Sequence, residues 1–245
     1  MVRLLILGGT AEAAALARAV AGRAEIITSL AGRAGVPDLP GRVRVGGFGG
    51  AAGLEAFLRA EAVDAVIDAT HPFAARISAH AEAACQAAAV ARLVLARRQW
   101  RRDADDRWIL VDSVAEAAAR LPEIGRRAFL TVGAGDVAGF TDVRGVWFLV
   151  RLLQERRQPL AACAVITGRP PFTVEAEEAL MRAHGIDVLV TKASGGDATY
   201  AKIEAARRLG LAVLMIRRPP PPAGETVETI AAALGWLENL TLDSL

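Results

Sequence analysis

The chain has 245 residues and a formal net charge of +2, because 29 lysines and arginines nearly balance 27 aspartates and glutamates. This balance argues against a nucleic-acid-binding protein, which usually carries a strong basic excess. Hydrophobic residues make up 53% of the chain, enough for a sizeable core, yet no apolar run reaches the length that spans a membrane. We therefore expect a cytoplasmic monomer of one or two domains, with neither a nucleic-acid nor a membrane partner.

The first predicted strand, residues 2–7, leads at once into Gly8 and Gly9 and then, past Thr10 and Glu12, into an alanine-rich helix over residues 13–21. Such a turn binds phosphate, because glycine lets the backbone approach the ligand and the first helical N–H groups face its charge. The usual dinucleotide fingerprint ends in a third glycine, where this chain has alanine. The alternative is that both glycines only close a tight turn. Their place on the first strand favours nucleotide binding by Gly8, Gly9, Thr10 and Glu12.

The second predicted strand, residues 25–28, ends where an NAD-binding protein places the acid that holds the ribose 2′-hydroxyl. This chain has Ser29 there, and Arg33 follows in a short glycine loop. A serine hydroxyl can hydrogen-bond to a 2′-phosphate and an arginine can neutralise it, whereas a carboxylate would repel it. An ordinary solvated loop arginine is the alternative. The absence of an acid together with the presence of a base favours NADPH as the cofactor.

The next elements continue the α/β pattern. We predict strands over residues 42–45, 64–69 and 91–95, with helices over residues 51–60 and from Pro72 to about residue 89. Thr70 and His71 lie where a strand meets its helix, at the edge where open α/β sheets bind ligands. We expect both to contact the cofactor, although a histidine at this place is equally often a capping or packing residue.

A charged segment without periodicity, residues 97–107, follows a first domain that we assign to residues 1–96. We predict that this segment is a linker and that residues 108–245 form the second domain. Further predicted strands cover residues 108–111, 127–132, 146–152, 162–167, 187–191 and 211–216, and a last helix covers about residues 225–237. Apolar strands that alternate with helices in both halves predict an α/β fold of two Rossmann-like parallel-sheet domains with a cleft between them.

Cysteine and histidine residues are too few and too scattered to predict a metal site. Cys85 and Cys163 are the only cysteines, and both lie in apolar surroundings typical of buried thiols. None of the three histidines belongs to a ligand motif. We expect no metal cofactor.

Five motifs follow one another along the chain in an order that is known from one enzyme family. They are Leu5–Glu12, Ser29–Arg33, Asp68–Ala74, Leu130–Gly133 and Thr191–Gly196. In sequence and order they resemble the precorrin-6A (precorrin-6x) reductases of cobalamin biosynthesis, and the resemblance spans nearly the whole chain. It implies an enzyme that uses a nicotinamide cofactor to reduce one macrocycle double bond of precorrin-6A, giving precorrin-6B (dihydroprecorrin-6x). Ala193 departs from the family's usual Lys-Asn-Ser-Gly-Gly loop, which concerns the substrate side.

The tetrapyrrole substrate that the resemblance implies carries several acetate and propionate side chains. We therefore expect spaced cations and backbone donors around it, in the second domain above all. The candidates at predicted ligand-side loops or strand ends are Arg76, Arg151, Arg169, Lys192, Ser194, Gly195 and Gly196. For each cation the alternative is a solvated surface base. Lys192 is the best candidate, since it opens a glycine turn at a strand end.

We predict His71 and Lys192 as the catalytic residues, on loops that face one another across the cleft. His71 would orient the nicotinamide or polarise the reacting bond, and Lys192 would hold a substrate carboxylate.

Two rival functions remain open. A short-chain dehydrogenase would need a Tyr-x-x-x-Lys pair, but the position four after the only tyrosine, Tyr200, is Glu204, and Lys202 has the wrong spacing. A non-catalytic NADP-binding sensor is the other alternative, and only turnover of a tetrapyrrole would exclude it.

Overall fold

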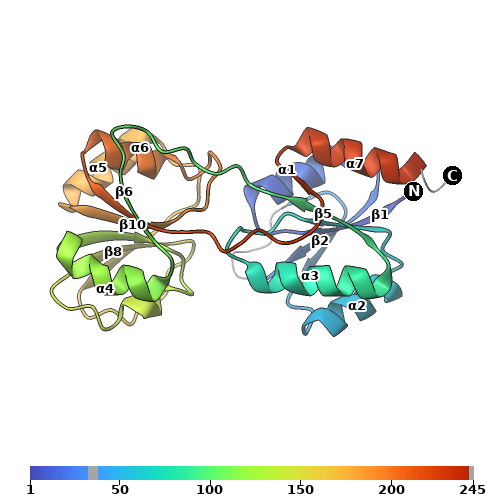
Figure 1. The fold of residues 1–245 in the computed structure, drawn as a ribbon, viewed down its shortest axis with the longest axis horizontal. Coiled ribbons are helices and arrows are strands. Elements are labelled where there is room, and N and C mark those ends of the chain that lie inside the picture. The colour runs from blue at the N-terminus through green and yellow to red at the C-terminus, as the bar shows by residue number, and fades with distance from the viewer. Residues whose placement is uncertain (33–37, 243–245) are drawn as a thin grey trace. The chain divides into compact units, whose positions relative to one another are not determined.

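The computed structural model of the chain describes residues 1–32 and 38–242. Arg33, which we predicted to bind the 2′-phosphate, lies outside the described residues. The chain divides into two compact units (Figure 1). The first unit joins Met1–Arg98 to Pro219–Leu245, and the second unit is Gln99–Arg218.

The first unit is built on a six-stranded, wholly parallel sheet with the strand order β12-β5-β4-β1-β2-β3. Its strands are β1 (Arg3–Leu7), β2 (Glu25–Leu30), β3 (Arg42–Val45), β4 (Ala65–Asp68), β5 (Ala91–Leu95) and β12 (Thr226–Val227). This order is that of dinucleotide-binding sheets, in which the sixth strand completes the side begun by the fourth and fifth. The predicted α/β class is confirmed.

Helices cover both faces of the first sheet (Figure 1). Helices α1 (Ala11–Ala19) and α7 (Ile230–Leu242) lie on one face, and α2 (Ala51–Ala60) and α3 (Ala75–Ala88) lie on the other. Successive residues of a strand point to opposite faces, so Leu4 and Ile6 enter the core with α1 and α7, whereas Leu5 and Leu7 enter the core with α2 and α3. Burial on both faces explains the unbroken apolar run.

The predicted second domain was wrong at its C-terminal end. We assigned residues 219–245 to it, but β12 pairs with β5 and α7 packs beside α1 in the first unit. The physical reason is that Ala233 and Leu237 of α7 are buried in the core that also holds Leu4 and Leu16. Without α7 part of that sheet face would be exposed to water.

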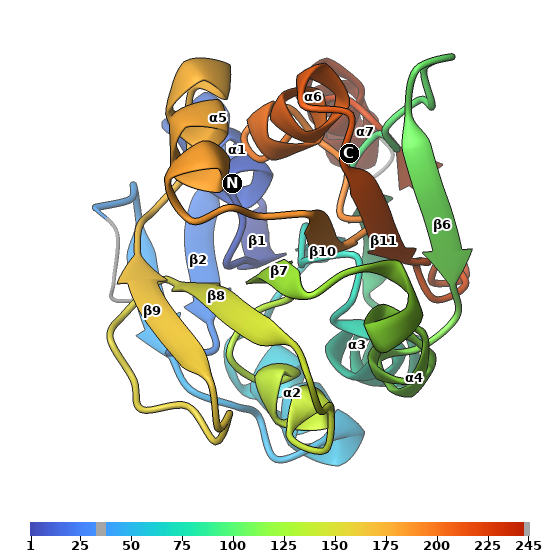
Figure 2. The same ribbon diagram turned by 90° about the vertical axis from the view of Figure 1, so that its left-hand side faces the viewer.

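The second unit has a parallel sheet in the order β6-β11-β10-β7-β8-β9, with helices α5 (Val174–Ala183) and α6 (Ala201–Arg208) on one face and α4 (Val114–Ile124) on the other (Figure 2). The strands are β6 (Arg107–Val111), β7 (Arg127–Thr131), β8 (Trp147–Leu152), β9 (Cys163–Thr167), β10 (Val188–Lys192) and β11 (Ala212–Ile216). A short 3₁₀ helix, η1 (Val137–Phe140), lies between β7 and β8.

The two sheets share one topology, with their sixth strands exchanged along the chain. The strand after β5 is β6, which takes the sixth place in the second sheet, and the strand after β11 is β12, which takes the sixth place in the first. The chain therefore passes between the units twice, after Arg98 and after Arg218.

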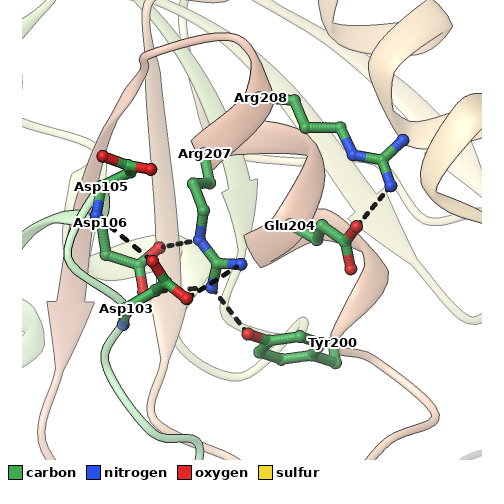
Figure 3. A network of polar contacts seen from close by, with 7 residues as sticks. All are labelled: Asp103, Asp105, Asp106, Tyr200, Glu204, Arg207 and Arg208. Carbon is green, nitrogen blue, oxygen red and sulfur yellow. Dashed lines mark hydrogen bonds and ion pairs between the residues drawn. The ribbon is translucent and has the colours of Figure 1, made fainter.

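The predicted linker, residues 97–107, was also largely wrong, because most of it packs within the second unit. The buried carboxylate of Asp106 accepts hydrogen bonds from Nε and Nη2 of Arg207 at 2.9 and 3.2 Å (Figure 3). Arg207 also donates to the Tyr200 hydroxyl at 2.7 Å. The bond to Asp106 raises the pKa of the Arg207 guanidinium. This network anchors the charged segment to α6.

Candidate active site

The carboxyl ends of β1 and β4 bring together residues that we singled out from distant parts of the sequence. Connections leave β1 and β4 toward opposite sides of the sheet, and ligands bind outside the strand ends at such a point. Gly8 follows β1, and Thr70 and His71 follow β4. The hydroxyl of Thr10 donates to the Ala69 carbonyl at 2.8 Å, which ties the two loops together.

The turn before α1 favours glycine at both positions. Gly9 has a φ of 104°, which is strained for any residue with a side chain, and a Cβ on Gly8 would approach Thr28 to 3.2 Å. Thr10 caps the helix by accepting from the Ala13 N–H at 3.1 Å. The close backbone and the helix N-terminus fit a diphosphate.

Glu12 lies in the first turn of α1 and forms an ion pair with Arg97, with 2.5 Å between Oε2 and Nη2. Arg97 lies just after β5, so its guanidinium belongs to the same edge of the sheet. We had assigned Arg97 to the linker. The signal that could have found it is a cation two residues beyond the end of a predicted strand.

Ser29, the residue before the last of β2, is almost fully buried, with 7% of its surface exposed. Its hydroxyl oxygen accepts a hydrogen bond from Nη1 of Arg44 at 3.1 Å. Ser29 and Arg44 are direct partners in the parallel pairing of β2 with β3. The sequence analysis missed Arg44, because the register of two strands decides which residues meet.

The loop after β4 is organised by Asp68, of which only 2% is exposed. Its Oδ1 accepts from the backbone N–H of Thr70 at 3.1 Å and from the Thr70 hydroxyl at 2.7 Å, while Oδ2 has no hydrogen-bond partner among the described residues. His71 Nδ1 accepts from the Phe73 N–H at 3.2 Å. A neutral His71 ring therefore carries its proton on Nε2. Arg76 lies exposed in the first turn of α3.

In the second unit, β7 and β10 occupy the places that β1 and β4 have in the first. Lys192, the last residue of β10, forms an ion pair with Asp136 in the loop after β7. The two loops thus meet at the carboxyl edge of the second sheet.

The glycine turn after Lys192 is held through its carbonyl groups. Arg218 donates to the carbonyls of Ala193 and Ser194 at 2.7 and 2.8 Å, and the Trp100 indole N–H donates to that of Gly196 at 2.7 Å. Gly195 and Gly196 have φ values of 65° and 71°, in the left-handed region. Ser194, Gly195 and Gly196 therefore form a fixed turn.

Arg151 is placed differently from the prediction that it binds substrate. Its side chain is 12% exposed and forms an ion pair at 2.5 Å with Glu177, which is 1% exposed. The guanidinium also lies 4.0 Å from the ring centre of Phe172 and 4.7 Å from that of Phe129. These contacts satisfy the charge inside the second unit, so a structural role explains Arg151 better.

Two surface hollows, of about 330 and 320 Å³, lie at the other edges of the sheets. The first adjoins the starts of β2 and β3, and the second adjoins the start of β8. Neither contains the polar groups described above. We place a candidate site at the carboxyl edge of each sheet, because the polar groups of each unit lie there.

Two features were not found in the described part of the chain. In residues 1–32 and 38–242 no group of three or more histidine, cysteine, aspartate or glutamate side chains could hold a metal ion. The helices of the same residues are all too short or too polar to cross a membrane.

Comparison with known proteins shows one family. The family model described as "Precorrin-6x reductase CbiJ/CobK" matches residues 3–238. The chain is 49% identical over 246 residues to the precorrin-6A reductase of Rhodococcus erythropolis, covering 98% of this chain and 99% of the relative. The cobalt-precorrin-6A reductase of Priestia megaterium is 30% identical over 253 residues, with 97% and 99% covered. The solved structure titled "CobK precorrin-6A reductase" superposes with a TM-score of 0.92 at 43% identity, covering 98% of this chain and 97% of the other.

Proposed function

The chain belongs to the precorrin-6x reductase family of cobalamin biosynthesis, and from this membership we propose that it reduces precorrin-6A to precorrin-6B with NADPH as the hydride donor. The bound cofactor supplies the hydride, whereas the protein supplies binding, orientation and charge. The observation that carries the proposal is the meeting of the Gly8–Gly9 turn with the Thr70–His71 loop at one edge of the first sheet.

The first unit has the features that a dinucleotide requires. The turn at Gly8 and Gly9 has no side chain between its backbone and a diphosphate, and the N-terminus of α1 follows it directly. Arg97 neutralises the carboxylate of Glu12, which would otherwise repel the phosphates. Thr70 and His71 follow β4, the strand beside β1, and we place the nicotinamide next to them.

The residues at the carboxyl end of β2 favour NADPH over NADH as the cofactor. Ser29 stands where an NAD-binding protein has its ribose-binding acid, and a serine is compatible with a 2′-phosphate. Arg33, four residues later, would add a neutralising charge.

The second unit supports binding of a substrate with several carboxylates. Lys192 lies at the carboxyl edge of the sheet in an ion pair with Asp136, and the turn Ser194–Gly196 beside it is fixed through its carbonyl groups. We propose that Lys192 pairs with one substrate carboxylate and that the turn's backbone N–H groups bind another. In the first unit, Arg76 is a further candidate cation, and its place at a helix N-terminus, where a cation does not stabilise the helix, favours a role in binding.

The test is an absorbance assay of NADPH oxidation with a panel of tetrapyrroles: precorrin-6A, cobalt-precorrin-6A and an earlier precorrin. We expect turnover of precorrin-6A with NADPH and slower turnover with NADH. The higher identity to metal-free precorrin reductases favours precorrin-6A over its cobalt complex. Tight NADPH binding without oxidation by any member of the panel would favour a non-catalytic sensor instead.

A further inference from the structure

The guanidinium of Arg44 is held rigidly at the carboxyl end of β3. Nη1 donates to the Ser29 hydroxyl at 3.1 Å and to the Gly46 carbonyl at 2.7 Å, and Nη2 donates to the Gly47 carbonyl at 2.8 Å. Its central carbon lies 3.8 Å from the ring centre of Phe48. Because these contacts fix the position of the guanidinium in advance, little side-chain freedom remains to be lost on ligand binding.

No carboxylate compensates this charge among the described residues. Arg97 and Lys192 at the carboxyl edges of the two sheets are each paired with an acid, as is Arg151 inside the second unit. Arg44 instead donates to one hydroxyl and two carbonyl groups. Partial burial lowers the pKa of Arg44, yet an arginine remains charged at neutral pH. A fixed positive charge that has no carboxylate partner within residues 1–32 and 38–242 therefore lies beside the end of β2.

The hydrogen bond from Arg44 also determines what Ser29 offers to a ligand. Since the Ser29 oxygen already accepts from Nη1, its own O–H hydrogen remains available to donate to a ligand. Ser29 is thus set as a donor beside a cation, an arrangement that suits an anion with several acceptor oxygens.

We propose that Arg44 and Ser29 form the subsite for the 2′-phosphate of NADPH, and that Arg44 is a specificity-determining residue of this reductase. The inference rests on the proposed binding of a nicotinamide cofactor to the first unit. The adenosine ribose of a dinucleotide lies at the end of the second strand, which is where the pair stands. Arg44 thus offers the positive charge at the 2′-phosphate that we had predicted from Arg33.

The experiment measures binding of 2′,5′-ADP and 5′-AMP, and of NADPH and NADH, to the full-length protein by calorimetry. The variants are Arg44→Gln, Arg44→Lys and Ser29→Ala, with Arg42→Gln as the matched control. Arg42 is on the same strand and the same face, but it lies at the amino end and pairs with Glu61. Thermal melts show whether each variant is folded.

Arg44→Gln should weaken 2′,5′-ADP and NADPH about ten- to a hundredfold and leave 5′-AMP and NADH within about twofold. Arg44→Lys should keep part of the preference for NADPH over NADH. Ser29→Ala should reduce this preference by a smaller factor than Arg44→Gln does. Arg42→Gln should change nothing.

Equal losses for phosphorylated and unphosphorylated ligands would overturn the inference, because they would mean that Arg44 only shapes the turn at Gly46. An unchanged preference in both Arg44→Gln and Ser29→Ala would overturn it as well, and Arg33 would then be the residue to test. If Arg44→Gln does not fold, the ligand preferences of Ser29→Ala and Arg44→Lys test the inference in its place. A wild-type protein that binds neither NADPH nor NADH would instead refute the proposed function itself.

Discussion

Glu12 in the first turn of α1 and Arg97 after β5 are 85 positions apart in sequence and form an ion pair with 2.5 Å between their charged atoms. A carboxylate in a first helical turn is favoured by the helix dipole but repels a phosphate at the same place. The Arg97 guanidinium removes that conflict. Both phosphates of a bound dinucleotide would then meet a neutral pair rather than an anion.

The variant Arg97→Gln should weaken NADPH and NADH equally, by about ten- to a hundredfold, since the diphosphate is common to both cofactors. Adding Glu12→Gln should restore part of the affinity, because it removes the carboxylate that was left without its partner. Calorimetric titration of the two single variants and the double variant measures both effects. A loss confined to NADPH would contradict this role and would place Arg97 at the 2′-phosphate.

Leu237→Ala should destabilise the first unit although Leu237 lies near the C-terminal end of the chain. Removing a buried leucine side chain costs about 2–5 kcal/mol of unfolding free energy. Hydrogen exchange should therefore rise in β1 and stay unchanged in β10. Leu189→Ala in the core of the second unit is the matched control and should show the reverse. Faster exchange in β10 of the Leu237→Ala variant would support the domain boundary that we first predicted.

Local signals made most of the fold predictable. The apolar run before Gly8 and the strand before Thr70 are found close to where the sequence analysis placed them, because a doubly buried strand needs an unbroken run of apolar residues. Strand β12 could not be predicted, since two residues carry no periodicity. The placement of α7 in the first unit depends on which core its apolar side chains fill, and this is a long-range property.

Only part of the candidate site was predictable from the sequence. The order of strand, turn and helix identifies Gly8, Gly9 and Thr10 from the sequence, and the glycine turn identifies Lys192. Arg44 and Arg97 are not identified in this way, because Arg44 meets Ser29 through the pairing of β2 with β3 and Arg97 meets Glu12 through the packing of the segment after β5 against α1. Contacts between residues that are far apart in the sequence are the ones that sequence reading misses.

Cys85 should resist alkylation in the native protein. Burial raises the pKa of the Cys85 thiol from 9.0 to about 11, and the nearby Asp68 acts in the same direction while Arg92 opposes it. The folded state therefore holds the proton more tightly than the unfolded state, so this contribution to stability is complete below pH 9 and is lost as the pH rises to about 11.

The expected loss over that pH range is about 2–3 kcal/mol. It is measured by comparing urea denaturation of wild type and Cys85→Ala between pH 8 and pH 11. Cys163, which is partly exposed, should react with a thiol reagent before unfolding and serves as the internal control. A Cys85 that reacts as fast as Cys163 at pH 8 would contradict the buried, protonated state.

His71→Ala should lower kcat by at least about tenfold with little change in NADPH affinity, if the ring contacts the nicotinamide or the reacting bond. His71→Asn separates this role from loop shaping. An asparagine oxygen can accept the Phe73 N–H as Nδ1 does, but it offers nothing at the position of Nε2. We expect both variants to be equally slow in single-turnover reduction of precorrin-6A. Recovery of the wild-type rate in His71→Asn would show that the histidine only holds the turn.

Lys192→Met should raise KM for precorrin-6A about ten- to a hundredfold and leave the affinity for NADPH unchanged, because the ammonium group would hold a carboxylate away from the transferred hydride. The variant also leaves Asp136 without its ion-pair partner, so Lys192→Met/Asp136→Asn is needed to separate lost attraction from added repulsion. The double variant should recover only part of the loss. Arg107→Gln, at the amino end of β6, removes a positive charge from the opposite edge of the same sheet and should leave KM unchanged. If Lys192→Met binds precorrin-6A as wild type does, the Lys192–Asp136 pair is a structural link between two loops, and the substrate lies elsewhere.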